Sequence, residues 1–583
     1  MIDVDTTLGL VGSFGKKQCI NYLIYCIVLM SSTWHLLSVS FTVGEPEGYN
    51  CRTPLNATPG EYVSSDDGCH LLRRVTDGNT TTTEEDNTTV SSSCVEGWEY
   101  ESVHGETSIV TEFDLICDDA IIGSTLVSIH FAGCLIGSYV TGQISDMFGR
   151  RTAVLVSLIG VVLTGVGMSF SKSYALIATL KFFNGCFIPA LLIVTYVRTI
   201  EMFPPGLRVR SHFGSGLFWV SGLVMVAPLA YIMPDWRQFQ LITSLMYIPF
   251  IPLVWYSYES IRWLVQMGRI EEAEVILKTF AKSKGIQYTR FPIQDLEDTE
   301  ERRTVLPKEE EAAGPTPSKE GGDEGDGMQE VCVKETKSTR KYTLMDLFRT
   351  RALIAPTLII FYCWFSCSVV YYGFLLHATN LVGNKYLNFS LLSFVELPCY
   401  AVNFIITTRY GRRRPLMLDL LFGGVASIVT GFLPLETASG TSLVVLQLVI
   451  VIFGRFCVAM AFDLVYLVTM EVFPTVLRNV GAGSASMVGR VGGMVAPFIV
   501  FLNVYHGSIP LVVFGVMSVV AGLLIVPLPE TNNRLLPETL DDGEKLAKME
   551  VPAKKNCEMA KSSSPNVMAL LTAREKSELA SEP

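Results

Sequence analysis

Residues Gly142-Gln-Ile-Ser-Asp-Met-Phe-Gly-Arg-Arg151 form a short polar stretch between two long apolar segments. Glycine lets two helices close on a tight connection, and the two arginines supply the positive charge that keeps short loops on the cytoplasmic side of a membrane. The stretch therefore predicts a cytoplasmic turn between two membrane-spanning helices.

Three pairs of segments repeat along the chain at nearly equal offsets. They are Gly149-Arg-Arg151 with Gly411-Arg-Arg413, Glu201-Met-Phe-Pro-Pro-Gly-Leu-Arg208 with Glu471-Val-Phe-Pro-Thr-Val-Leu-Arg478, and, more weakly, Glu259 and Arg262 with Glu530 and Arg534. The first two offsets are 262 and 270 positions. Echoes of this kind indicate that the chain consists of two similar halves.

The composition places these halves in a membrane. Of the 583 residues 17% are charged, against about 25% in soluble domains, and the mean hydropathy is +0.38. An α-helix rises about 1.5 Å per residue, so about 20 residues cross a hydrocarbon core of about 30 Å. Twelve apolar segments are long enough. They run over residues 18–41, 121–142, 152–170, 174–199, 213–233, 239–257, 353–377, 388–407, 415–435, 443–470, 480–503 and 509–528. The sequence predicts an all-α integral membrane protein with twelve transmembrane helices in two pseudo-symmetric six-helix halves.

The polar segments complete the domain organisation. We expect a cytoplasmic N-terminus over residues 1–17, a first half over 18–257, a cytoplasmic linker over 258–350, a second half over 351–530 and a cytoplasmic tail over 531–583. The later part of the linker and the tail are too poor in apolar residues to order themselves and are predicted to be disordered. The formal net charge of -11 lies mostly in loops, and nucleic-acid binding is not expected.

The long polar segment over residues 42–120 is predicted to lie outside the cell. It is rich in Asp and Glu, and Asn56, Asn79 and Asn87 begin glycosylation acceptor motifs, which act only on that side. Its four cysteines are Cys51, Cys69, Cys94 and Cys117. In an oxidising space four cysteines can pair in three ways, so we expect two disulfides with the connectivity open.

Several short motifs resemble those of one known family, the organic cation, anion and zwitterion (carnitine-type) transporters of the major facilitator superfamily. The motifs are Phe14-Gly-Lys-Lys-Gln18, Glu259-Ser-Ile-Arg-Trp-Leu264, Val370-Tyr-Tyr-Gly373, Tyr386-Leu-Asn-Phe389, Val395-Glu-Leu-Pro398 and Leu528-Pro-Glu-Thr531. The resemblance spans nearly the whole chain. It departs from the family pattern at Ile261, where the family has Pro, and at Thr407-Thr408, where it has an acid.

Acidic residues lie close to arginines at the predicted cytoplasmic turns. The resemblance implies that such pairs lock the outward-open state and break as the halves rock; alternatively, they only anchor helix ends in the headgroup layer. The candidate gating residues are Asp146, Arg150, Arg151, Glu201, Arg208, Glu259, Arg262, Arg412, Arg413, Glu471 and Arg478. The expected pairs are Glu201 with Arg208, Glu471 with Arg478, Glu259 with Arg262, and Asp146 with an arginine of a neighbouring loop.

The prediction of a substrate site rests on three charged residues inside apolar segments. Asp463 and Glu396 lie about 12 Å, and Arg490 about 15 Å, along their helices, which places all three near the midplane. An ionised group there costs about 2.5–3.5 kcal/mol, so it must face water, a partner or a ligand. We expect these residues to bind the substrate. The alternative is structural, with Asp463 neutralised by Arg490, and Glu396 held by the backbone or by Lys181.

The resemblance narrows the choice of substrate. Arg490 falls where cation-selective members carry Asp and where anion-type and carnitine-type members carry Arg, whereas Asp463 stands where relatives usually have an uncharged residue. Two carboxylates around one guanidinium suit a quaternary amine or a carnitine-like zwitterion. An ammonium group is also held by aromatic rings, at about 0.5–2 kcal/mol for each ring. The aromatic candidates are Trp219, Trp364, Tyr371, Tyr372 and Tyr466.

The sequence therefore predicts a plasma-membrane secondary transporter for small organic cations or zwitterions, with both termini in the cytoplasm. The alternatives are an organic anion transporter of the same family and, less favoured, a non-transporting membrane receptor on the same scaffold. An enzyme, a cofactor and a metal site are not expected, because no motif for them is found. The expected partners are a small organic ion and the lipid bilayer, with coupling to sodium or protons left open.

Overall fold

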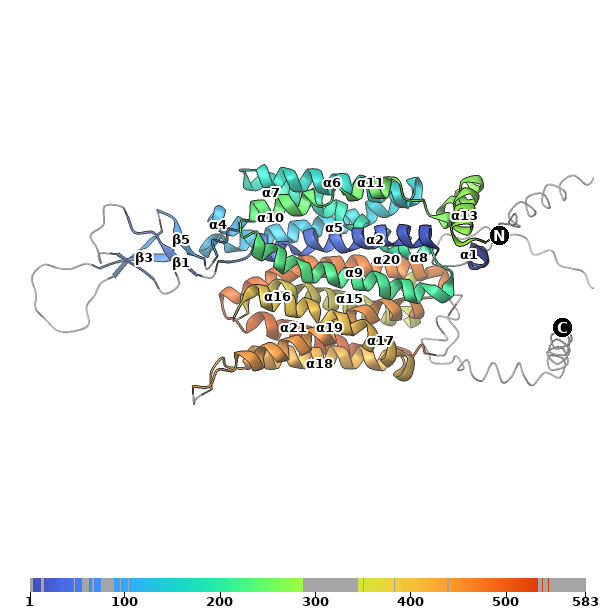
Figure 1. Ribbon diagram of the computed structural model, residues 1–583. Helices are drawn as coiled ribbons and strands as arrows, with labels where there is room; N and C mark the ends of the chain where they lie inside the picture. The colour runs from blue at the N-terminus through green and yellow to red at the C-terminus, as the bar shows by residue number, and fades with distance from the viewer. Residues whose placement is uncertain are drawn as a thin grey trace, which may run out of the picture.

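The helices of the computed structural model lie side by side and form one bundle (Figure 1). The structure describes residues 4–11, 15–286, 344–532, 537 and 544, apart from residues 47, 55–61, 66–67, 75–88, 95, 103, 350, 382 and 438–439. In this part of the chain eleven helices are long and apolar enough to cross a membrane, and Ile509–Leu524 is a shorter apolar helix. They correspond to the twelve predicted segments, which confirms the predicted fold. The predicted glycosylation sites Asn56, Asn79 and Asn87 lie outside the described residues.

The first half contains six spans, three of them made of consecutive shorter helices. They are α2 (Lys16–Leu37) with α3 (Val39–Thr42), α5 (Ala120–Phe148), α6 (Arg150–Phe170), α7 (Tyr174–Pro189) with η2 (Ala190–Val194) and α8 (Thr195–Glu201), α9 (Pro205–Ile232), and α10 (Trp236–Leu245) with α11 (Phe250–Trp255). η2 is a π-helical turn that directly follows Pro189. A proline inside a helix removes one backbone donor, which accounts for the looser turn at this point.

The second half repeats this arrangement. Its spans are α15 (Arg351–His377) with η4 (Ala378–Asn380), α16 (Lys385–Phe394) with α17 (Glu396–Tyr410), α18 (Arg413–Phe432), α19 (Val444–Val472), α20 (Thr475–Phe501) with η5 (Leu502–Val504), and α21 (Ile509–Leu524).

Two predicted helices, 239–257 and 388–407, are each interrupted, and prolines explain both breaks. Pro249 lies four residues after Leu245, where α10 ends, and Pro398 lies four residues after Phe394, where α16 ends. Since proline has no N–H, the carbonyl four residues before it loses its helical donor. The second break places Glu396 at the first residue of α17.

Glycines bring helices of the same half into backbone contact. A Cβ atom on Gly133 of α5 would lie 2.1 Å from the carbonyl oxygen of Phe182 in α7, and one on Gly515 of α21 would lie 2.6 Å from that of Gly424 in α18. Small residues at such crossings let membrane helices approach closely and gain van der Waals contact. The α5–α7 and α18–α21 pairs are therefore tightly packed units.

The two halves meet along two seams, where α5 packs against α20 and α9 packs against α16. In the first seam the Ser128 hydroxyl donates to the carbonyl oxygen of Met494 at 2.8 Å, and the Phe131 ring covers Gly493.

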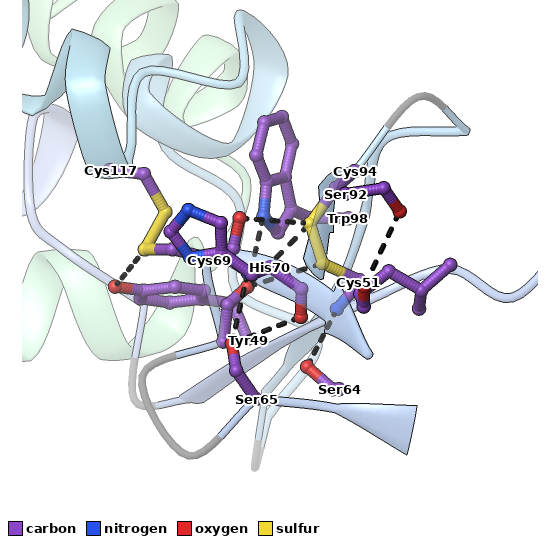
Figure 2. The surroundings of a disulfide bond; sticks show 12 residues. Tyr49, Cys51, Ser64, Ser65, Cys69, His70, Ser92, Cys94, Trp98 and Cys117 are labelled. Carbon is purple, nitrogen blue, oxygen red and sulfur yellow. Dashed lines mark hydrogen bonds between the residues drawn. A yellow bond between two sulfur atoms is a disulfide. The ribbon is translucent and has the colours of Figure 1, made fainter. Parts of the chain in front are cut away.

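The short strands lie beyond one end of the bundle (Figure 1). β1 (Gly48–Cys51) pairs with β5 (Trp98–Glu101), and β3 (His70–Arg74) lies between β2 (Tyr62–Ser64) and β4 (Thr89–Ser93), all antiparallel. Two disulfides, Cys51–Cys94 and Cys69–Cys117, hold the strands together and fix one of the three possible connectivities (Figure 2). The second disulfide joins the strand region to η1 (Cys117–Asp119). The chain runs from the strands through α4 (Ile109–Glu112) and then η1 into α5.

Short helices cover the opposite end of the bundle. α1 (Val4–Val11), α12 (Ile261–Gln266) and α13 (Ile270–Lys284) share an apolar cluster that includes Leu8, Leu264 and Leu277. α12 and α13 form the described start of the predicted linker, and η3 (Leu344–Phe348) is described near its end.

Candidate substrate site

All eight side chains predicted to bind substrate line one cavity between the two halves. Its volume is about 340 Å³, which is within the range of small-molecule sites. The walls come from α2, η2, α8 and α9 of the first half and from α15, α17, α19 and α20 of the second. The predicted residues on the walls are Trp219, Trp364, Tyr371, Tyr372, Glu396, Asp463, Tyr466 and Arg490. Their contact with a substrate remains a prediction.

Glu396 is neutralised by an arginine that the sequence reasoning did not single out. Arg455 of α19 forms an ion pair with Glu396, and neither side chain is more than 5% exposed. Arg455 also donates from Nη1 to the carbonyl oxygen of Tyr371 at 3.2 Å, and its guanidinium lies 3.8 Å from the centroid of the Tyr371 ring. The expected alternative partner Lys181 lies on α7 of the other half. The sequence does contain a signal for this pair: Arg455 is a second charged residue, besides Asp463, in the apolar segment 443–470.

Asp463 and Arg490 are not paired with each other among the described residues. Asp463 accepts a hydrogen bond from the Asn403 amide at 2.9 Å, and its other carboxylate oxygen lies 3.6 Å from Nε2 of His212. Arg490 lies beside the Tyr372 and Tyr466 side chains. The structural alternative of an Asp463–Arg490 pair is therefore wrong. The cavity keeps one negative and one positive charge that do not cancel locally.

The aromatic residues form a connected wall around these charges. Tyr466 contacts Trp364 edge-on, with 4.2 Å between ring centroids, and Tyr371 contacts Tyr372 at 5.3 Å. The indole N–H of Trp364 donates to the Thr469 hydroxyl at 2.9 Å, which fixes that ring. Tyr466 is 44% exposed, so it offers the most accessible ring of this set.

Comparisons with known proteins identify the family of this fold and cavity. A family model described as "Sugar (and other) transporter" matches residues 78–540. The chain is 30% identical over 464 residues to Solute carrier family 22 member 6-A of Xenopus laevis, an alignment that covers 79% of this chain and 76% of that protein. The chain belongs to the organic ion transporters of the major facilitator superfamily. It is therefore a transporter and not an enzyme.

Other similar proteins bear both cation and anion names. The transporter is 29% identical to "Organic cation transporter protein" of Drosophila melanogaster (94% of this chain, 96% of that one), and 28% identical to human "Organic anion transporter 3" (92% and 93%). A solved structure of the xylose transporter XylE from E. coli, in a partially occluded inward open conformation, matches with a TM-score of 0.55 at 14% identity over 88% of this chain and 99% of that chain. The last match shows the fold.

In the first half of the transporter, a charged cluster joins the helix ends around the turn between α5 and α6. Arg150 lies 2.9 Å from Asp146 and 3.4 Å from Glu201. Glu259 accepts hydrogen bonds from the backbone N–H groups of Arg150 and Arg151 at 3.1 Å, and the Ser260 hydroxyl donates to Glu201. A carboxylate at the start of a helix is favoured by the helix dipole, so Glu259 stabilises the start of α6.

The second half carries the same cluster at the repeated positions. Arg412 lies 3.4 Å from Glu471, and Glu530 accepts from the backbone N–H groups of Arg412 and Arg413 at 2.8 and 3.2 Å. The Thr531 hydroxyl donates to Glu471, as Ser260 does to Glu201. The repeated sequence segments therefore form equivalent charged clusters in the two halves.

The predicted pairing inside these clusters needs correction at two positions. Asp146 pairs with Arg150 of its own turn, not with a neighbouring loop, because the two lie four residues apart across the helix end. Arg478 forms no ion pair with Glu471 among the described residues, because Glu471 faces Arg412 and Thr531. Arg262 donates to the carbonyl oxygen of Glu201 at 3.3 Å, and Arg208 lies near the start of α9. All these contacts stay within one half, and a gating role remains a prediction.

We expect Gly149→Ala to destabilise the transporter. Gly149 has a φ of 97°, and a Cβ atom there would lie 2.5 Å from the Glu259 carboxylate. A non-glycine residue in such a conformation costs about 1–3 kcal/mol, and the clash would displace Glu259 from α6. The measurement is the melting temperature of the purified protein. Gly142→Ala, inside α5, is the control, since a Cβ there meets nothing within 4 Å; equal effects of both changes would contradict the prediction.

The two halves are also in contact at the end of the bundle that carries the strands. Glu106, in the segment between β5 and α4, forms an ion pair with Lys385 and accepts from the Tyr386 hydroxyl at 2.9 Å. The Tyr386 ring is stacked on Phe41, with 5.4 Å between centroids.

Proposed function

We propose that the protein is a plasma-membrane secondary transporter that moves small organic cations or zwitterions, such as quaternary amines or carnitine-like compounds, by alternating access. The observation that carries the proposal is that Asp463 and Arg490 face one cavity without being paired to each other. Since Arg455 neutralises Glu396, Asp463 is the carboxylate left for an ammonium group. A zwitterion satisfies both charges at once.

The aromatic wall supports the same proposal. A quaternary ammonium cannot donate an N–H hydrogen bond, so it depends on ring faces and on a nearby negative charge. Tyr466 and Tyr372 line the cavity with Asp463 and Arg490, which suits a ligand that has an apolar cationic end and an anionic end. Sites at the interface of the two halves, near the midplane, are where such carriers bind substrates.

An organic anion is the alternative substrate, and Arg490 is the observation that favours it. In that case Asp463 would have to be neutralised by protonated His212, 3.6 Å away, leaving Arg490 as the net charge of the site. The two hypotheses differ in what happens when Asp463 loses its charge.

The test is uptake of labelled tetraethylammonium, carnitine and para-aminohippurate in one expressing cell line, with and without external sodium. Asp463→Asn is expected to lower uptake of tetraethylammonium and carnitine by about 10-fold or more, because a charged contact is worth about 1.5–3 kcal/mol. Uptake of para-aminohippurate should not fall. Ser486→Ala, an uncharged change on the cavity wall, is the control. Wild-type uptake of para-aminohippurate but of neither tetraethylammonium nor carnitine, left intact by Asp463→Asn, would favour the anion transporter.

A further inference from the structure

A histidine and an aspartate face each other across the two halves. His212 lies on α9 of the first half and Asp463 on α19 of the second, and both line the cavity. Their side chains are 34% and 36% exposed, and 3.6 Å separates Nε2 from the nearer carboxylate oxygen. This distance is too long for a firm hydrogen bond. It is short enough for a charged imidazole and the carboxylate to attract each other, and both side chains are reached by water in the cavity.

The surroundings of His212 accept both of its protonation states. Nδ1 lies 2.7 Å from the Tyr196 hydroxyl, whose oxygen can accept from Nδ1–H in the charged ring and in the neutral ring that keeps this proton. In the charged ring Nε2–H points toward Asp463, whose second oxygen is held by Asn403. Nε2 is therefore the nitrogen that can lose and regain a proton while Nδ1–H stays hydrogen-bonded to Tyr196.

Other charged and titratable groups lie around the pair. Tyr400 of α17 packs edge-on against His212, with 5.8 Å between centroids, and Tyr466 lies on α19 with Asp463. Of the cavity charges, Glu396 is already neutralised by Arg455, and Arg490 stays protonated at any physiological pH. Imidazole is the side chain that changes charge between about pH 5 and 8.

We propose that His212 and Asp463 form a proton-binding site, at which a proton and the ammonium group of the substrate exchange. With His212 protonated, the imidazolium and Asp463 attract each other across the halves. When an ammonium group approaches Asp463, His212 releases its proton to the cavity water. One positive charge leaves as one enters, so the charge of the site is conserved. The inference rests on the proposed cation or zwitterion transport and names its coupling ion.

The first experiment measures protons released on binding. Tetraethylammonium is added to the purified full-length transporter in weakly buffered detergent solution at pH 6.5, and binding and pH are followed together. The wild-type protein is expected to release protons in proportion to the cation bound. His212→Gln keeps a hydrogen-bonding group beside Tyr196 but cannot titrate, so it should bind without releasing protons. His506→Gln is the control, since His506 is an exposed residue beside η5.

The second experiment measures transport in proteoliposomes. An outward proton gradient, with pH 6 inside and pH 8 outside, is expected to raise uptake of labelled tetraethylammonium several-fold in the wild type and in His506→Gln. In His212→Gln the gradient should have no effect. If His212→Gln binds or takes up tetraethylammonium and still releases as many protons as the wild type, the proposed proton site is wrong, while the proposed substrate class stands. Failure of the wild type to bind either tetraethylammonium or carnitine would overturn the proposed substrate class as well.

Discussion

Glu396→Gln is expected to lower the free energy of unfolding by about 3–5 kcal/mol and to remove most of the transporter from the cell surface. The change leaves the guanidinium of Arg455, which is 0% exposed, without its counter-ion in a membrane interior. Removing one partner of a buried ion pair is costly because the other charge remains buried. The measurement is the melting temperature of the purified protein together with surface expression.

A double variant separates the cost of a lone charge from other effects. Glu396→Gln combined with Arg455→Met removes both charges, and we expect it to recover most of the stability lost in the single variant. Glu272→Gln is the matched control, because its ion pair with Arg269 on α13 is about half exposed and should contribute little. A single variant as stable as the wild type, or a double variant no better than the single one, would contradict the role given to Arg455.

Arg490→Asp is expected to change the charge preference of transport. The variant replaces the positive charge of Arg490 with a second carboxylate in the cavity that Asp463 also lines. Uptake of tetraethylammonium should rise, and uptake of carnitine and para-aminohippurate should fall by about 10-fold or more, since their carboxylates lose a charged partner worth about 1.5–3 kcal/mol. Uptake of the three labelled compounds in one cell line measures the effect.

Arg490→Gln distinguishes the loss of a positive charge from the gain of a negative one. With this neutral side chain, carnitine uptake should fall while tetraethylammonium uptake changes less than in Arg490→Asp. Unchanged ratios among the three compounds in both variants would show that Arg490 does not face the substrate.

Much of the architecture could be predicted because it depends on local sequence. Apolar length sets the membrane spans, and the repeated turns around Gly149 and Gly411 mark equivalent charged clusters in the two halves. The breaks in two helices were also encoded locally, by Pro249 and Pro398, although the predicted spans ran through them. A proline removes the donor for the carbonyl four residues earlier, so the position of each break could have been predicted.

The pairing of charges could not be predicted in the same way. The contact between Glu396 and Arg455 joins α17 to α19, and it depends on how the two helices are rotated relative to each other. The same holds for His212 and Asp463, which belong to different halves. The disulfide connectivity was open for a similar reason, since four cysteines in one loop allow three pairings until the strands are placed.

The glycine crossings of α5 with α7 and of α18 with α21 restrict how the protein can move. Where one backbone already touches another, neither helix can slide or tilt without a collision. A conformational cycle that exposes the cavity to each side of the membrane in turn must therefore carry these helix pairs as fixed blocks. The strain of each cycle then falls on the seams α5–α20 and α9–α16, where side chains rather than backbones meet.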